Sequence, residues 1–376
     1  MMPKSGSITE GEYLEFRSMR FFNNMGYFSR RGILLKHYFY PETIDITDID
    51  VYGIKWRADF SNDIIIAQCK SGTSKTQKKT ADPILWLNGL DRILPSRKAY
   101  LFKVNISSKL KDFANSHDII PIDNPRLSEI EKQLDLEKWE GSYDIKNHEK
   151  IIEYYELIKK YPEKFKEHYW FIKSDYWTLP YNIQIKKLIY YINNILNTLS
   201  YDKDEYKWML IESVILFSVS IINFCYEVSL YNEDKREKYI EIKMIEGRNK
   251  IEDMERLMSY TKSIIISKVQ EKTGELIKLD DNEFKIGTPE YTNKLIELIS
   301  RLLSKPKLAI LVPSFLDYFL YGVVINQREI TSEALCDKFR LNKQELDVLA
   351  KLCKNIIVFL DINADRRQAF EKILNF

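Results

Sequence analysis

The sequence pattern changes near residue 126, and this change constrains the fold more than any other feature of the chain. Before it, short β-rich runs alternate with short helical patterns. After it, long segments rich in Lys, Glu, Ile and Tyr show helical periodicity. Alternation of the first kind is typical of an α/β unit. The sequence therefore predicts an α/β domain over residues 7–126 and an all-helical region over residues 127–376.

The expected elements follow from hydrophobic periodicity and from turn residues. In the first part we expect helices at 11–25, 82–94 and 107–116 and strands at 44–52, 64–70, 99–104 and 119–122. In the second part we expect helices at 127–136, 148–159, 181–199, 207–230, 238–272 and 292–303. With only 12 glycines in 376 residues, the chain has little material for a Gly-rich phosphate loop.

Charge, cysteines and hydropathy exclude several classes of protein. The 57 basic and 55 acidic residues give a net charge of +2, so overall basicity does not argue for nucleic acid. The four cysteines form no C-x-x-C pair, which favours reduced thiols in a cytoplasmic protein over disulfides or zinc. The polar start of the chain has no apolar secretion signal. Residues 213–226 are uncharged but shorter than the roughly 20 residues of a membrane span, so we expect a buried helix and no membrane partner.

The most informative residues lie on two neighbouring predicted strands. The run 64–70 is dense in β-branched residues, yet it carries Gln68 and Lys70, which share a face because side chains alternate along a strand. By the same alternation Asp48 and Asp50 share a face of the preceding strand. An acid, an amide oxygen and an ammonium at adjacent strand ends suit phosphodiester hydrolysis with Mg²⁺. Strand-edge acids and a lysine that extends to solvent are the plainer alternative.

These residues resemble the PD-(D/E)xK nuclease superfamily, and within it the Mrr-like restriction endonucleases that carry glutamine in place of the usual acid. The resemblance rests on Asp50 within Ile-Asp-Val, on Gln68-Cys69-Lys70, and on Glu15 within Leu-Glu-Phe of the first helix. The later strand, helix and strand over residues 100–123 are similar to the end of that domain. The resemblance covers about a third of the chain. It implies a restriction-endonuclease-like α/β core, which is a mixed sheet flanked by helices.

The resemblance also implies roles for individual residues. Asp50 would bind Mg²⁺, or Mn²⁺ in its place, and Gln68 would contribute its side-chain carbonyl oxygen. Lys70 would act on the attacking water, and Glu15 would hold a metal-bound water or a second ion. An ordinary exposed helix glutamate is the alternative for Glu15. Asp48 is a spare metal ligand, and Gln68 brings no negative charge to the site.

Two further segments could contact DNA. Lys75, Lys78 and Lys79 follow the second catalytic strand, and Arg30 and Arg31 follow the first helix, so all five could contact phosphates. For the lysines a solvated loop is an equal alternative. Residues 330–351 read as two short helices joined by a turn, with Ser332 as N-cap. This pattern is similar to a helix-turn-helix, although an ordinary helical hairpin fits it better.

Taken together, the sequence predicts a metal-dependent DNA endonuclease for restriction or antiviral defence. The helical region would select the target, sense a trigger or dimerise. A homodimer follows from the two-fold symmetry of a DNA duplex. Two alternatives stay open: a DNA-binding or scaffold protein whose nuclease core is weak or inactive, and a repair or RNA-directed nuclease of the same superfamily.

Overall fold

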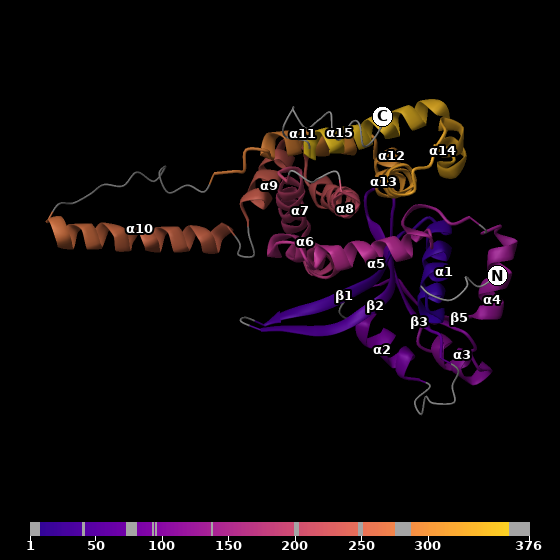
Figure 1. The fold of residues 1–376 in the computed structure, drawn as a ribbon. Coiled ribbons are helices and arrows are strands. Elements are labelled where there is room, and N and C mark those ends of the chain that lie inside the picture. The colour runs from indigo at the N-terminus through magenta and orange to yellow at the C-terminus, as the bar shows by residue number, and fades with distance from the viewer. Residues whose placement is uncertain are drawn as a thin grey trace.

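The chain folds into a sheet-containing N-terminal part and a larger helical part (Figure 1). The computed structural model describes residues 8–39, 42–72, 81–91, 94, 96–136, 138–198, 203–246, 251–274 and 287–360. An α/β core followed by a helical region is therefore confirmed as the general architecture.

A mixed sheet forms the N-terminal part, with five strands in the order β1-β2-β3-β4-β5. The strands are β1 (Phe28–Phe39), β2 (Glu42–Trp56), β3 (Asn62–Lys70), β4 (Lys98–Lys103) and β5 (Ile119–Asp123). The first three pair antiparallel, and β3, β4 and β5 pair parallel. The parallel pairs need crossovers. These contain α2 (Asp82–Asp91) and α3 (Ser108–Asn115).

Helix α1 (Glu10–Asn24) is held against the sheet by its ends and by its apolar face. The Thr9 side chain accepts a hydrogen bond from the Glu12 main-chain N–H at 3.2 Å, and the Glu12 carboxylate accepts one from the Thr9 N–H, which completes a capping box. After the helix the chain turns at Gly26, where φ is +83°. A Cβ on Gly11 would lie 3.4 Å from Ser71 Oγ, so the start of α1 lies beside the end of β3.

The remaining chain is helical. The helices and single turns are α4 (Asn124–Gln133), η1 (Gly141–Tyr143), α5 (Asn147–Ile158), α6 (Glu163–Lys173), η2 (Asp175–Thr178), α7 (Tyr181–Leu196), α8 (Asp204–Ser229), α9 (Glu233–Ile245), α10 (Ile251–Thr273), α11 (Thr292–Leu303), α12 (Pro306–Ala309), α13 (Val312–Leu320), η4 (Tyr321–Ile325), α14 (Ser332–Phe339) and α15 (Lys343–Leu360). Helix α8 is central to this part, whereas α10 projects away from it (Figure 1).

Two helical segments of the described chain are long and apolar enough to cross a membrane, Asp204–Ser229 and Pro306–Ile325. Their apolar windows are 100 % and 61 % buried inside the fold. The predicted burial of the uncharged stretch in α8 is confirmed, except at Tyr226, which is 38 % exposed. Burial against the rest of the protein thus accounts for the composition of both segments, as in the core of a soluble protein.

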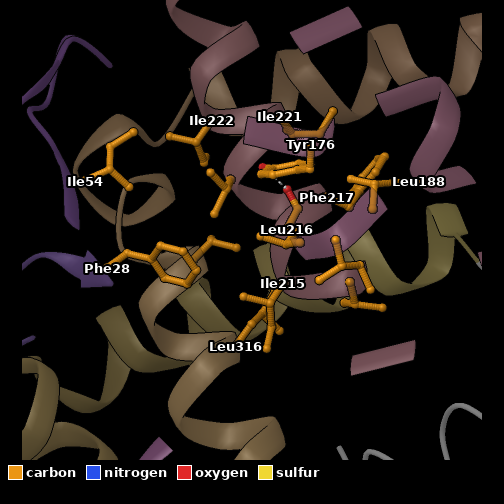
Figure 2. Packing of buried hydrophobic residues seen from close by; sticks show 14 of the residues in the cluster. Phe28, Ile54, Tyr176, Leu188, Ile215, Leu216, Phe217, Ile221, Ile222 and Leu316 are labelled. Atoms are coloured by element: carbon orange, nitrogen blue, oxygen red, sulfur yellow. Dashed lines mark hydrogen bonds between the residues drawn. The ribbon is translucent and has the colours of Figure 1, made fainter. Parts of the chain in front are cut away.

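The two parts of the chain share one hydrophobic core. One face of the sheet packs on α1, through residues such as Phe22, Val51 and Phe102. The other face joins the core of the helical part. Figure 2 shows Phe28 and Ile54 of the sheet next to side chains of α8 and α13. Trp56 Nε1 also donates to Asn223 Oδ1 of α8 at 2.7 Å. Residue 126, the predicted domain boundary, lies within α4.

Several elements differ from the prediction. Strand β1 was not predicted, because Arg30, Arg31 and Gly32 interrupt its apolar alternation. The pattern at 238–272 corresponds to two helices, α9 and α10. Helices α6, α12 and α13 were also not predicted. Helix α15 extends to Leu360, well beyond the predicted end at 351, and the other expected helices and strands are found within a few residues of their predicted ends.

Candidate active site

Asp50 lies where β2 and β3 separate. The ladder between these strands ends at the pair Val51 and Ala67, so Asp50 is the first residue of β2 beyond it. Asp50 is buried, with only 7 % of its surface exposed. Asp50 Oδ2 accepts hydrogen bonds from the Cys69 main-chain N–H at 2.6 Å and from Gln68 Nε2 at 3.1 Å. The structure therefore brings the predicted acid and amide together.

The electrostatic surroundings of Asp50 include most of the predicted site. Burial raises the pKa of Asp50, while the hydrogen bond from the Cys69 N–H and the charge of Lys70 oppose this rise. The negative charge of Asp48 also raises the pKa of Asp50. Asp48 itself is exposed and pairs with Leu34 in the β1–β2 ladder. Its carboxylate makes no hydrogen bond or ion pair with the described site residues, so it stands at the edge of the site.

Lys70 ends β3 and is partly buried. Among the described residues its ammonium has no hydrogen-bond or ion-pair partner, although its charge lowers the pKa of Asp50. A lysine close to a carboxylate but not paired with it is free to act on water or phosphate. Lys70 thus lies near Asp50, and its action on the attacking water stays a prediction.

Glu15 reaches the site from α1 and is bound there by an arginine. Its Oε2 lies 3.0 Å from Arg31 Nη1, and both side chains are only about a fifth exposed, at 20 % and 23 %. Burial raises the pKa of Glu15 to about 7; Arg31 lowers it and the nearby charge of Asp50 raises it further. Its proton occupancy therefore changes near neutral pH.

Arg31 connects Glu15 to two residues that the sequence did not single out. Arg31 Nη2 lies 2.7 Å from His148 Nδ1, and His148 Nε2 lies 3.3 Å from Glu12 Oε1. An arginine can only donate, so Nδ1 accepts and Nε2 carries the proton that faces Glu12. The spacing of Glu12 and Glu15 on one helix face was the available signal for Glu12. His148, from α5, had none.

Arg30 corrects the predicted nucleic-acid surface. Its side chain is buried in the interior, where Nε lies 3.2 Å from Glu212 Oε2 and Nη2 lies 2.8 Å from Asp317 Oδ1. Both carboxylates come from the helical part, which no local pattern around Arg30 indicates. From this position Arg30 cannot contact a phosphate on the surface. Arg31 remains partly exposed, but its partners are Glu15 and His148.

The other predicted DNA contacts fall into two groups. Lys75, Lys78 and Lys79 lie outside the described residues. The pattern at 330–351 does form two helices, α14 and α15, joined by a turn at Arg340 with φ +53°. Thr331, not Ser332, caps α14, because its side chain accepts from the Ala334 N–H at 3.2 Å. The start of α15 is exposed.

The donor set of the site suits a hard cation that keeps most of its water. In the described part of the chain no group of three or more His, Cys, Asp or Glu residues could hold a metal ion. The available donors are Asp50 Oδ1, which has no hydrogen-bond partner in that part, and Gln68 Oε1. Mg²⁺ is commonly held by one or two carboxylates, several waters and a substrate phosphate. Asp50 and Gln68 fit such an ion, although with less charge than two carboxylates.

Comparisons with known proteins add no relative. The chain matches no family model, no curated protein and no solved structure. The geometry of the site therefore carries the functional argument.

Proposed function

We propose that the protein is a Mg²⁺-dependent endonuclease that hydrolyses phosphodiester bonds of duplex DNA. The observation that supports it is the convergence of Asp50, Gln68 and Lys70 where β2 leaves β3. The three side chains come from two different strands and meet because these strands pair in one register. Alternation of polar and apolar residues within a single strand would not bring them together. The resemblance to PD-(D/E)xK nucleases, with a restriction-endonuclease-like core, belongs to the same proposal.

Each residue has a role that its position supports. Asp50 and Gln68 would hold the cation through side-chain oxygens, and Mn²⁺ could replace Mg²⁺ in such a set. Such a cation would supply Lewis-acid polarisation of the phosphate and a more acidic water. Lys70, which has no hydrogen-bond or ion-pair partner in the described part of the chain, positions the attacking water and neutralises developing charge. Glu15, with a pKa of about 7, could accept a proton from a water at the site.

The biological setting is part of the proposal. Cleavage of both strands of a duplex is easiest with two active sites related by a two-fold axis, which a homodimer supplies. The resemblance supports a role in restriction or antiviral defence, in the cytoplasm, as part of this proposal. Helices α14 and α15 present exposed residues that can contact the DNA target.

Plasmid cleavage tests the proposal. Supercoiled and linear duplex DNA are incubated with the protein in Mg²⁺, Mn²⁺ or EDTA. We expect metal-dependent cleavage that Asp50→Ala and Lys70→Met each reduce at least 100-fold. Asp45→Asn on the same strand and Lys98→Met on β4 are the matched controls, because both side chains are exposed. Equal activity of Asp50→Ala and the parent contradicts the proposed site.

Gln68 favours a second function, a DNA-binding scaffold with an inactive core. Its amide N–H donates to Asp50, which is a stable arrangement without any metal. This alternative predicts DNA binding that Mg²⁺ does not strengthen, and no cleavage of any substrate by the parent. Branched DNA and RNA are included as substrates, since preferential cleavage of either identifies a repair or RNA-directed nuclease.

A further inference from the structure

A small pocket lies between α1, β1, α6 and α8, next to the Glu15–Arg31 pair of the candidate active site. Its volume is about 70 Å³. Its charged lining residues are Arg30, Arg31, Lys173 and Glu212, and two indole rings, Trp177 and Trp208, form part of its wall. Three cations and one carboxylate therefore line the same small space.

The carboxylates near this cavity are already bound to other groups. Glu212 Oε2 pairs with Arg30, and Glu212 Oε1 accepts a hydrogen bond from the Tyr321 hydroxyl. Arg30 is further balanced by Asp317. Glu15 pairs with Arg31. None of these carboxylates is left to balance the third cation.

That third cation is Lys173, the last residue of α6. Its ammonium makes no hydrogen bond or ion pair with the described residues. Burial, with repulsion from Arg31, lowers the pKa of Lys173 to about 8. Lys173 is only partly exposed, and an ammonium that is partly removed from water is stabilised by a nearby counter-charge. The end of α6 supplies only the partial negative charge of its last carbonyls.

Arg31 has donors to spare beside Lys173. It uses one N–H toward Glu15 and one toward His148, out of the five N–H groups of a guanidinium. Planar N–H groups next to an ammonium form the usual recognition set for a tetrahedral oxyanion.

The cavity volume limits what can bind. Pockets for drug-sized ligands and cofactors measure about 300–1,000 Å³, and a cavity of about 150 Å³ holds benzene. A space of about 70 Å³ excludes a nucleotide or a base. It accommodates a few waters or one small ion.

We propose that this cavity binds one small tetrahedral oxyanion, such as inorganic phosphate or sulfate, between Lys173 and Arg31. The anion would neutralise the ammonium and join α6 to β1 from inside the fold. The proposal does not depend on nuclease activity.

The test uses the full-length protein and the fluorescence of the cavity tryptophans. Phosphate and sulfate are titrated at constant ionic strength, which is set with gluconate because that anion is too large for the cavity. Adenosine monophosphate is a third titrant. The variants are Lys173→Met, the exposed control Lys164→Met on the same helix, and the double variant Trp177→Phe/Trp208→Phe. Tryptophan emission and the melting temperature are followed together.

We expect saturable changes in emission and melting temperature for phosphate and sulfate in the parent and in Lys164→Met. Lys173→Met should bind at least tenfold more weakly, and adenosine monophosphate should have no comparable effect. The double tryptophan variant should lose the emission change but keep the rise in melting temperature. The proposal is overturned if the parent shows no saturable response, which means that the cavity holds only water. Equal binding by Lys173→Met, or an undiminished emission change in the double tryptophan variant, would also overturn it.

Discussion

Replacement of Arg30 by methionine is the sharpest test of how the sheet and the helices are joined. Arg30 and its partners Glu212 and Asp317 are all nearly inaccessible, with side chains 10 %, 6 % and 6 % exposed. Loss of one member of such a buried ion pair leaves uncompensated charge and costs about 3–5 kcal/mol. For a chain of 376 residues this corresponds to a fall of about 4–6 °C in melting temperature.

The control is Arg97→Met, because Arg97 pairs with Asp63 at 2.6 Å on the surface and is 58 % exposed. Exposed pairs contribute about 0–1 kcal/mol. Urea unfolding followed by circular dichroism measures both variants. The triple change Arg30→Met, Glu212→Gln and Asp317→Asn removes every charge of the cluster and should recover much of the lost stability.

The loss should also depend on pH. Burial already raises the pKa of Asp317, and without Arg30 this pKa rises further, so protonation relieves the variant as the pH falls. Arg30→Met should therefore be closer to the parent at pH 5 than at pH 8. If Arg30→Met is no less stable than Arg97→Met at pH 8, the described burial of the cluster is wrong.

Three other results are expected. Gln68→Glu places a second carboxylate beside Asp50, so without metal it should melt lower than the parent, while Mg²⁺ should raise its melting temperature more than that of the parent; an unchanged response to Mg²⁺ argues against the metal site. The folded-state pKa of Glu15, about 7, lies above the ordinary glutamate value of 4.5, so its contribution to stability is most favourable below pH 4.5 and is lost as the pH rises to 7. Relative to the parent, Glu15→Gln should thus gain up to about 3 kcal/mol in urea unfolding between pH 4.5 and pH 8; a constant difference between the two proteins contradicts the raised pKa. Gly53→Ala should destabilise by about 1–3 kcal/mol, because its Cβ would lie 2.8 Å from Ile65 Cγ1, whereas Gly89→Ala in α2 meets nothing within 4 Å and should stabilise by about 0.5–1 kcal/mol; thermal unfolding of the pair decides.

The local sequence pattern correctly predicted the elements that are apolar and buried along most of their length. The β3 run has three consecutive isoleucines, and the uncharged stretch of α8 is buried except at Tyr226, so each pattern is strong. In β1 the charged pair Arg30-Arg31 and the positive φ of Gly32, +61°, obscure the alternation. That strand is stabilised by tertiary partners, which a window of sequence does not contain.

The candidate site shows the same division. Asp50 and Gln68 were predicted to face each other because strand alternation and order are local properties, and the two side chains do form a hydrogen bond. The burial of Arg30 was not predicted, because the carboxylates that pair with it lie far along the chain. The link from Glu15 through Arg31 to His148 also depends on the packing of α5, so sequence reasoning could not reveal it.

The common interior of strands and helices has a practical and an evolutionary consequence. A fragment that stops at residue 126 would leave Phe28, Ile54 and Trp56 facing solvent instead of α8. Such a fragment should aggregate, and its failure to cut DNA would say nothing about its chemistry. For the same reason the helices cannot be exchanged as a cassette between proteins; they must change together with the surface of the sheet on which they rest.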